Sequence, residues 1–387
     1  MNEEIRRELE ELERKGRLRR LRTVEARRGP WVRVSGRWLL NLSSNDYLGF
    51  SAEPPEISAL TEILERFGLG AGAARLLSGN HALYAELEEE LARLYRRPAL
   101  IFSSGYLANL GVLSGLCGRR DAIFSDKLVH ASLIDGMRLS GAAFYRYPHL
   151  DLEALEGLLK KHRGKHRRAV ILTESVFSMD GDFPDLSALS ELSARYEALL
   201  VVDEAHAVGV FGEKGLGLCE ELGVLSRVDV LVGTFGKALG SYGAFVVARE
   251  EIRELLVNRA RSFIFTTALP AVVVAGALAG LKRAVAAGDR RKRVRGLSRF
   301  LREALRLPSQ GLSSEVPIVP VILGEDRKAL SVSERLYEAG FLAPAIRPPT
   351  VPEGTARLRL SLSATMKEQD LLRLAEHLRD EICGPCS

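Results

Sequence analysis

Short apolar runs alternate with amphipathic, helix-like segments through the middle of the chain. Several of these runs are apolar throughout, which is typical of strands that are covered on both faces of a sheet. They lie at residues 99–102, 122–124, 143–145, 169–172, 199–202, 230–232 and 244–247. Strands that alternate with helices over about 150 residues favour an α/β fold with a mainly parallel central sheet.

The two ends of the chain follow other patterns. Ile5, Leu9 and Leu12 recur at helical spacing and predict a short amphipathic helix, and residues 32–34 and 38–40 predict a hairpin around Ser35-Gly36. Beyond about residue 289 the order becomes helix, strand, helix, strand, helix, which predicts a smaller α+β domain. We therefore predict an N-terminal segment (1–44) that packs with the small domain, a large domain (45–288) and a small C-terminal domain (289–387).

Composition places the chain among ordinary soluble proteins. Of its 387 residues 46% are hydrophobic and 27% charged, and 55 basic residues against 50 acidic ones leave a net charge of only +5. The longest apolar stretch, 268–281, contains Pro270 and is shorter than the roughly 20 residues that span a bilayer. Residues 1–22 lack the apolar block of a secretory signal. We expect a cytoplasmic protein that does not associate with membranes.

One basic cluster interrupts this even distribution of charge, the run KKHRGKHRR at residues 160–168. It is expected to be a solvated loop between a helix and a strand. The alternative is a docking patch for an acidic partner such as a carrier protein. Nucleic-acid binding is disfavoured, because no aromatic residue is interleaved with the charges.

Three short motifs match known patterns without the structural context that these patterns require. Gly236-Lys237 resembles a P-loop, but Ala238 stands where Ser or Thr is needed. Residues 68–73 imitate a dinucleotide fingerprint, although residues 64–67 are expected to end a helix rather than a strand. Cys383-Gly-Pro-Cys386 spells a redox-type CxxC motif, but only one residue follows it.

Polar residues that directly follow the predicted strands carry the candidate chemistry, because ligands of open α/β sheets bind at the carboxyl ends of strands. The turn at 103–106 feeds a helix N-terminus, where backbone N–H groups suit a phosphate. Asp203 and His206 follow one strand, and Lys237 follows the next, between small residues. An amine for a Schiff base, an anion for a ring nitrogen and donors for a phosphate together fit pyridoxal 5'-phosphate.

Longer blocks of the chain resemble the α-oxoamine synthases, a family of pyridoxal-phosphate enzymes with the aspartate-aminotransferase-like fold (fold type I). The family-like blocks are residues 41–49, 76–81, 173–182, 202–206 and 234–237. The likeness covers nearly the whole chain, from Asn41 to Arg359. It departs from the family at Ala71, where serine is common, and at Ser175, where glycine is often found.

The resemblance implies a role for each matching position around the cofactor. Lys237 would hold pyridoxal phosphate and remove the α-proton of the bound amino acid. Asp203 would pair with the ring nitrogen, and His206 would hydrogen-bond the ring oxygen. His130 would stack on the ring and help to position the substrate carboxylate. The other implied cofactor contacts are Gly105, Tyr106, Ser178 and Thr234.

Further positions are implied to bind the substrate or to act across a subunit interface. Arg359 would grip the amino-acid carboxylate, with Asn45 nearby, since a guanidinium matches a planar carboxylate. Arg19 and Thr350 match substrate-contact positions. Thr266 and Thr267 resemble residues that reach the phosphate from the neighbouring subunit, which implies a homodimer with shared active sites.

Residues 345–360 most resemble the branch of the family that condenses L-alanine with a pimeloyl thioester, since the sister branches usually differ around Arg347. The implied reaction is a decarboxylative Claisen-type condensation that yields 8-amino-7-oxononanoate for biotin synthesis. The acyl carrier is either coenzyme A or an acyl carrier protein. The nearest alternative is a glycine C-acetyltransferase type of condensation. A nucleotide-binding oxidoreductase would need a strand before Gly68, and a non-catalytic regulator would show damage at Lys237 or Asp203, both of which are intact.

Overall fold

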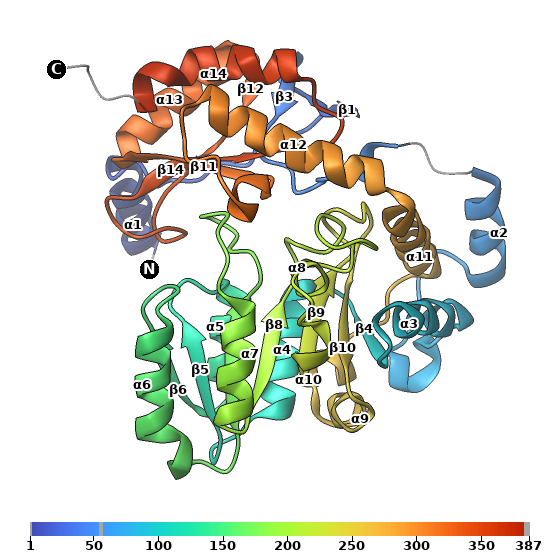
Figure 1. Ribbon diagram of the computed structural model, residues 1–387. Coiled ribbons are helices and arrows are strands. Elements are labelled where there is room, and N and C mark those ends of the chain that lie inside the picture. Colours follow the sequence, from blue (N-terminus) through green and yellow to red (C-terminus); the bar gives the residue numbers. More distant parts are fainter. Residues whose placement is uncertain (1, 54–56, 383–387) are drawn as a thin grey trace. The chain divides into compact units, whose positions relative to one another are not determined.

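The computed structural model describes residues 2–53 and 57–382 (Figure 1). Its internal contacts divide the chain into two compact units. The first unit takes in Met1–Ala52, Met179–Gly181 and Lys292–Ser387, and the second takes in Glu53–Ser178 and Asp182–Arg291. Residues 45–52 and 179–181 thus fall in the first unit, whereas the predicted boundaries put them in the large domain.

A seven-stranded sheet forms the centre of the second unit. In spatial order its strands are β4 (Ala99–Phe102), β10 (Ala244–Ala248), β9 (Val230–Thr234), β8 (Ala198–Asp203), β7 (Ala169–Glu174), β5 (Ala122–Asp126) and β6 (Ala143–Tyr147). Only β10 runs antiparallel to its neighbours β4 and β9, and the other pairs are parallel. The predicted strands and the mainly parallel sheet are confirmed.

Strand β10 sets the register of its two neighbours. Ala244 lies opposite Phe102 of β4 on one side and opposite Thr234 of β9 on the other. Because β10 is reversed between them, β4 and β9 run in the same direction. Their carboxyl ends therefore lie at the same edge of the sheet, where β7 and β8 also end.

Helices cover both faces of this sheet, as Figure 1 shows with α7 on one side and α4 on the other. The helices of the second unit are α2 (Ile57–Phe67), α3 (Ala82–Tyr95), α4 (Gly105–Leu116), α5 (Ala131–Ser140), α6 (Leu152–His162), α7 (Leu186–Arg195), α8 (Leu218–Glu221), α9 (Glu250–Arg259), α10 (Arg261–Ile264) and α11 (Ala271–Ala286). Val112 of α4 and Met137 of α5 share one core cluster with Val170 and Leu172 of β7. Ile171 between them is also fully buried but points to the other face, so apolar residues without alternation are what this sheet requires.

The first unit combines helices with two smaller sheets. One sheet contains β1 (Ala26–Arg28), β2 (Trp31–Val34), β3 (Arg37–Asn41) and β12 (Phe341–Leu342), and the other contains β11 (Ile318–Gly324), β14 (Ala356–Ser361) and β13 (Ala345–Ile346). The helices are α1 (Asn2–Arg14), α12 (Gly288–Ala304), α13 (Asp326–Glu338) and α14 (Glu368–Ile382), and the first residues of α12 count with the second unit. Ser35 and Gly36 both have positive φ, which is the type I′ geometry that a two-residue hairpin prefers.

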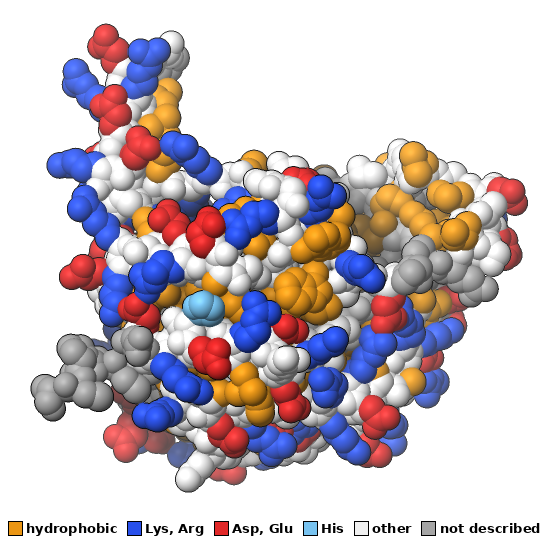
Figure 2. Space-filling view, turned by 90° about the horizontal axis from the view of Figure 1, so that it is seen from above, with side chains coloured by type: hydrophobic (Ala, Val, Ile, Leu, Met, Phe, Trp, Pro, Cys, Tyr) orange, Lys and Arg blue, Asp and Glu red, His pale blue; other side chains and the backbone are white. Residues whose placement is uncertain are grey.

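The basic cluster at 160–168 runs from the end of α6 to the start of β7 and is largely exposed, as expected, but two of its arginines also bind neighbouring segments of the chain. Arg163 donates to the carbonyl oxygens of Tyr196 and Glu197, and Arg167 pairs with the buried carboxylate of Asp121 at 2.8 Å. These arginines therefore hold neighbouring loops together. The cluster precedes β7, so it lies at the amino edge of the sheet, opposite the edge where the polar residues of interest lie. Figure 2, which views the molecule from above Figure 1, shows acidic and basic side chains interspersed over a different face of the molecule.

Two further features differ from the sequence expectations or lie beyond them. The short strands β1, β12 and β13 were not predicted, and the CxxC motif at 383–386 lies outside the described residues. Across 2–53 and 57–382, no single helix is long and apolar enough to cross a membrane; α11 and α12 pass such a test only as a pair, which is bent by 75°.

A glycine inside β9 gives a test of this packing. A Cβ built on Gly233 would lie 2.2 Å from the ring of Phe245 on β10. We expect Gly233→Ala to lower the free energy of unfolding by about 1–3 kcal/mol, because the strand and the ring must move apart. Chemical denaturation followed by circular dichroism measures this. Gly157→Ala, at an exposed position of α6 with open space around it, is the matched control and should stabilise the chain by about 0.5–1 kcal/mol.

Candidate active site

The carboxyl ends of β7, β8 and β9 and the N-termini of α4 and α5 enclose a cavity of about 190 Å³ in the second unit. Residues that the sequence predicted as one set line this cavity together: Gly105, Tyr106, His130, Asp203, His206, Thr234 and Lys237. Its wall also contains residues that the sequence reasoning did not single out as site residues: Asn109, Ser132, Glu174 and Ala205.

Lys237 reaches the cavity from a tight turn after β9. The hydroxyl of Thr234 donates to the carbonyl oxygen of Gly243 at 3.0 Å and accepts from the N–H of Gly236 at 3.1 Å, which closes the turn. The Nζ atom of Lys237 lies 2.8 Å from Nε2 of His206. An amine held at a cavity wall in contact with an imidazole can attack an aldehyde.

Asp203 ends β8 and is 6% exposed. Its Oδ1 atom accepts from the N–H of Ala205 at 2.9 Å, and its Oδ2 atom accepts from the amide of Asn109 at 2.7 Å. Each oxygen of this buried carboxyl group thus has its own donor, and the two donors fix its orientation. A carboxyl group held in this way at the cavity wall can face a ring nitrogen.

The N-terminus of α4 supplies donors for an anion. Ser104 caps this helix through its side-chain oxygen, which accepts from the N–H of Leu107 at 3.3 Å. The first backbone N–H groups of the helix, those of Gly105 and Tyr106, belong to residues that line the cavity. A Cβ built on Gly105 would lie 4.0 Å from Cβ of Thr234, so the helix start and the lysine turn are neighbours. Backbone donors and the helix dipole at this position suit a phosphate.

Two acidic groups of adjacent strands meet beside His130. Glu174 of β7 is the register partner of Asp203 and accepts from the backbone N–H of His130. Burial, followed by the charge of Asp203, raises the pKa of Glu174 well above its ordinary range. Burial also lowers the pKa of His130. Burial thus favours the neutral form of Glu174 and the neutral imidazole of His130.

Glu204 faces away from the cavity and serves the fold. It is fully buried and accepts from the hydroxyl of Ser175 at 2.6 Å and from the N–H groups of Leu218 and Cys219. Ser175, one of the two departures from the family pattern, thus has a partner within the protein. A Cβ on Gly217, whose φ is +122°, would collide with this carboxylate at 2.6 Å.

Three of the predicted cofactor contacts do not line the cavity. Ser178 lies in the loop that follows β7. Thr266 and Thr267 follow α10, and Thr267 forms an isolated bridge with Ala74. These three positions stay predictions.

The predicted substrate residues Arg359, Asn45, Arg19 and Thr350 lie in the first unit, in two groups. Arg359 of β14 is 8% exposed, and its guanidinium donates to Asn45 at 3.0 Å, to the hydroxyl of Ser361 at 2.6 Å and to the hydroxyl of Tyr47 at 3.3 Å. Burial raises the pKa of Tyr47, against the nearby charge of Arg359. Neutral oxygens therefore orient this guanidinium.

The second group surrounds the segment at 347–350. Arg19 donates to the carbonyl oxygen of Pro348 at 3.2 Å, Arg347 donates to the carbonyl oxygen of Gly16, and the N–H of Thr350 donates back to the carbonyl oxygen of Arg347 at 3.1 Å. The structure thus brings Arg19 next to the segment that contains Thr350.

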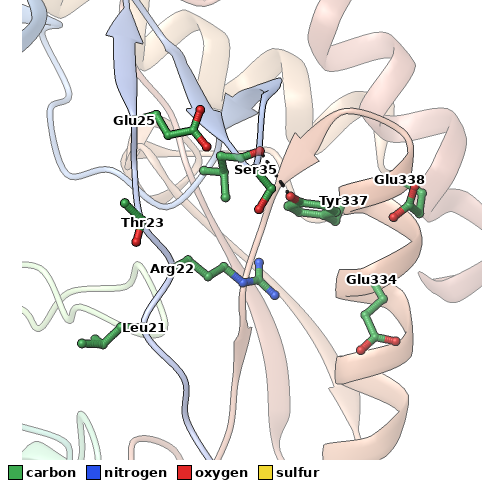
Figure 3. Close-up of a pocket in the computed structure, with 9 residues that line it drawn as sticks. Leu21, Arg22, Thr23, Glu25, Ser35, Glu334, Tyr337 and Glu338 are labelled. Carbon is green, nitrogen blue, oxygen red and sulfur yellow. Dashed lines mark hydrogen bonds between the residues drawn. The ribbon is translucent and has the colours of Figure 1, made fainter.

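A separate cavity of about 400 Å³ in the first unit contains none of the predicted residues (Figure 3). The guanidinium of Arg22 lies 5.4 Å from the ring centre of Tyr337, whose hydroxyl donates to the carbonyl oxygen of Val34. Three glutamates, Glu25, Glu334 and Glu338, complete a wall of mixed charge.

Comparison with known proteins decides the family. The model of the family "Aminotransferase class I and II" matches residues 37–378. The chain belongs to this family. Among similar proteins, an 8-amino-7-oxononanoate synthase of Chlorobaculum parvum is 48% identical over 386 residues, 98% of each chain. A putative 8-amino-7-oxononanoate synthase of Geobacillus kaustophilus is 50% identical over 96% of this chain and 95% of its own.

Solved structures of this aminotransferase-like family agree with the fold. A serine palmitoyltransferase of S. paucimobilis, whose structure contains PLP, matches with a TM-score of 0.88 at 30% identity over 97% of this chain and 96% of its own. An 8-amino-7-oxononanoate synthase of Francisella tularensis matches with a TM-score of 0.76 at 31% identity over 89% and 98% of the two chains. The predicted α-oxoamine synthase resemblance and the fold type I class are confirmed.

The loop after β7 is anchored by a histidine that contacts two aspartates. His149 contacts Asp126 at 2.9 Å through Nδ1 and Asp182 at 3.0 Å through Nε2, and its ring packs edge-on against Phe177. Burial opposes protonation of this ring, but the hydrogen bonds and charges of both aspartates outweigh it and raise the pKa of His149 to about 10. The imidazolium thus ties the end of β5 to the far end of the loop.

We expect this pair of contacts to make stability depend on pH. Because the pKa of His149 is raised from 6.5 to about 10, its contribution is complete below about pH 6.5 and is lost as the pH rises through about 10. Urea unfolding at pH 6 and at pH 10 should show His149→Gln to be destabilised more at pH 6 than at pH 10, relative to the parent. Gly157→Ala, which changes no titratable group, is the control and should give an equal difference at both pH values. An equal difference for His149→Gln as well would contradict the proposed role of a charged His149 between Asp126 and Asp182.

Proposed function

We propose that the chain is a pyridoxal-phosphate enzyme that condenses L-alanine with a pimeloyl thioester, releasing carbon dioxide and the free carrier and yielding 8-amino-7-oxononanoate. The observation that carries this proposal is the Lys237 amine 2.8 Å from His206 in a cavity that also contains Asp203. The relatives that are about half identical over nearly the whole chain are named for this synthase activity. The cytoplasm is the expected compartment, as a step in biotin synthesis implies.

The donor set of the cavity fits pyridoxal phosphate. Lys237 would bind its aldehyde as a Schiff base, Asp203 would bind its ring nitrogen, and the helix start at Gly105 would bind its phosphate. The orientation of Asp203, fixed by two donors, supports this assignment. When bound, the group withdraws electrons from the α-carbon of an attached amino acid and so makes the α-proton acidic. His206 is proposed to hydrogen-bond the ring oxygen, and Ser178 and Thr234 are proposed as further polar contacts.

The residues of the chain would then move one proton and orient two reactants. Lys237, once displaced by the amino group of alanine, is the base for the α-proton. A bond forms between the α-carbon of alanine and the thioester carbonyl carbon, and the thiol of the carrier leaves. The alanine carboxylate departs as carbon dioxide, and a proton returns to the α-carbon. His130, which burial keeps neutral, is proposed to position the carboxylate.

Arg359 is proposed to bind the alanine carboxylate together with Asn45. Its guanidinium is oriented by hydrogen bonds to the oxygens of Asn45, Ser361 and Tyr47. A carboxylate accepts two parallel N–H groups from such a fork. Arg19 and Thr350, which lie at the same segment of the first unit, are proposed to contact the acyl substrate.

A condensation assay tests the reaction. Purified protein is incubated with L-alanine and either pimeloyl-CoA or a pimeloyl carrier protein, and the product is identified by mass spectrometry. We expect 8-amino-7-oxononanoate and carbon dioxide in equal amounts. Glycine with acetyl-CoA and serine with palmitoyl-CoA are run in parallel, since solved relatives include serine palmitoyltransferases. Faster turnover of either pair would overturn the substrate assignment.

The role of Lys237 is tested separately. The protein should show visible absorbance that borohydride reduction fixes covalently to Lys237, detected by peptide mass spectrometry. Lys237→Ala should lose this covalent label and at least about 10³-fold of the activity, since removal of a catalytic group from a concerted site is severe. Lys282→Ala, on α11 outside the cavity, is the control. A Lys237→Ala protein that keeps turnover would exclude the assignment.

We also propose a homodimer in which Thr266 and Thr267 reach the phosphate of the partner subunit. Two segments of the second unit, joined by the bridge between Ala74 and Thr267, expose large apolar side chains. These side chains are Leu69, Leu76, Leu77 and Phe265, between 51% and 81% exposed. Large apolar side chains exposed on two bridged segments support association with a second copy.

Light scattering tests the dimer. The parent should have twice the chain mass of 42.5 kDa, and the double variant Leu77→Glu/Phe265→Glu should be monomeric and lose bound cofactor. Ile322→Glu is the control, because Ile322 is 60% exposed on β11 of the first unit. A double variant that remains a dimer would place the interface elsewhere.

A further inference from the structure

A hydrogen-bonded bridge connects Asp203 with His130 inside the cavity wall. The Nδ2 atom of Asn109, on α4, donates to Oδ2 of Asp203 at 2.7 Å and to the hydroxyl of Ser132 at 2.9 Å. The hydroxyl of Ser132, on α5, lies 2.7 Å from Nδ1 of His130. Neither Asn109 nor Ser132 was predicted from the sequence.

We propose that Asn109 and Ser132 are positioning residues that hold Asp203 and His130 in one fixed arrangement for the proposed reaction. Asn109 is 2% exposed and Ser132 is fully buried, so water does not compete for their hydrogen bonds. Both hydrogens of the Asn109 amide are used, one for each end of the bridge. This inference rests on the proposed function.

The orientation of Asn109 follows from the charge of its partner. A flipped amide would place its oxygen against the carboxylate of Asp203, where two acceptors repel. In the observed orientation Oδ1 of Asn109 is buried without a hydrogen-bond partner among the described residues. The protein thus leaves the Oδ1 atom of Asn109 without a hydrogen bond while the Nδ2 atom donates to Asp203. A buried polar atom without a partner lowers stability and is typical of functional sites.

Ser132 fixes the other end of the bridge. Its backbone N–H donates to Nδ1 of His130 at 3.2 Å, so Nδ1 acts as an acceptor. The neutral ring therefore carries its hydrogen on Nε2. Because Asn109 donates to Ser132, the hydroxyl hydrogen of Ser132 remains available for the same Nδ1 atom. The bridge thereby sets which nitrogen of His130 can donate to a ligand in the cavity.

The test compares Asn109→Leu, Ser132→Ala and their double variant in the cofactor-loaded enzyme. We expect Asn109→Leu to lower kcat for the alanine condensation roughly 10- to 100-fold, the size of a lost hydrogen bond to a charged group. The KM for alanine should stay within about twofold, because the residues around Arg359 are untouched. The visible circular dichroism of the bound cofactor should change in sign or intensity. This readout does not depend on turnover.

Coupling within the bridge gives the decisive measurement. Ser132→Ala should lower kcat less than Asn109→Leu, and the double variant should lie within about threefold of Asn109→Leu alone, because residues in one network are not additive. Ser132→Thr keeps the hydroxyl and should restore parental kcat. Ser114→Ala is the matched control, because Ser114 lies on α4, the helix of Asn109, but outside the bridge.

The outcomes separate the inference from the proposed function. A parent protein without bound chromophore or condensation activity would remove the proposed function itself. An active parent whose Asn109→Leu variant keeps both kcat and the visible spectrum would overturn the inference alone. The inference would also be overturned if the fold-losses of kcat in the two single variants multiplied in the double variant, since that would show two independent residues. If Asn109→Leu does not fold, Ser132→Ala against Ser132→Thr decides, and equal kcat in those two variants counts against the bridge.

Discussion

A buried carboxyl group at the end of β8 is the constraint on which the rest of the site depends. Asp203 is nearly inaccessible to water, so its oxygens need donors from the protein, and these come from the backbone of Ala205 and from Asn109 of α4. Those donors require α4 to begin directly after β4 and to pass beside the edge of the sheet. The same helix start supplies the backbone N–H groups that suit a phosphate. The need for donors to Asp203 thus constrains the position of α4, and the N-terminus of the same helix provides the N–H groups that suit an anion.

Charge is distributed unevenly among the ionisable groups around this carboxylate. Glu174 and Asp203 are partners on adjacent strands, and burial keeps the first neutral beside the second. His130 is also kept neutral by burial. Outside the cavity, Glu204 accepts hydrogen bonds from the backbone at the start of α8, and His149 carries a positive charge between two aspartates. Groups of the same chemical type thus do different work, according to how many donors and charges each one meets.

The sequence was sufficient for the strands, the parallel sheet and the residues that follow strand ends. Unbroken apolar runs have one physical explanation in a sheet covered on both faces, and the topology then gathers Asp203, His206 and Lys237 at one edge. It was not sufficient for Asn109 and Ser132, because each lies within a helix where a buried polar side chain carries no periodic signal. The spacing of Asn109 one helical turn after Gly105 was the available clue. The role of Arg163 and Arg167 was missed because a run of charges gives no indication of distant carbonyl partners.

The antiparallel strand β10 aligns the two strands beside it, β4 and β9, relative to each other. Ala244 of β10 lies opposite Phe102 on one side and opposite Thr234 on the other, so the turn before α4 and the turn that carries Lys237 are both aligned to one residue. A strand advances about 3.3 Å per residue, and side chains alternate between faces, so the smallest slip that preserves burial is about 7 Å. Inserted residues in β10 would thus separate two intact half-sites by more than a hydrogen bond can span. The distance between the turn before α4 and Lys237 therefore depends on the register in which β10 pairs with β4 and β9.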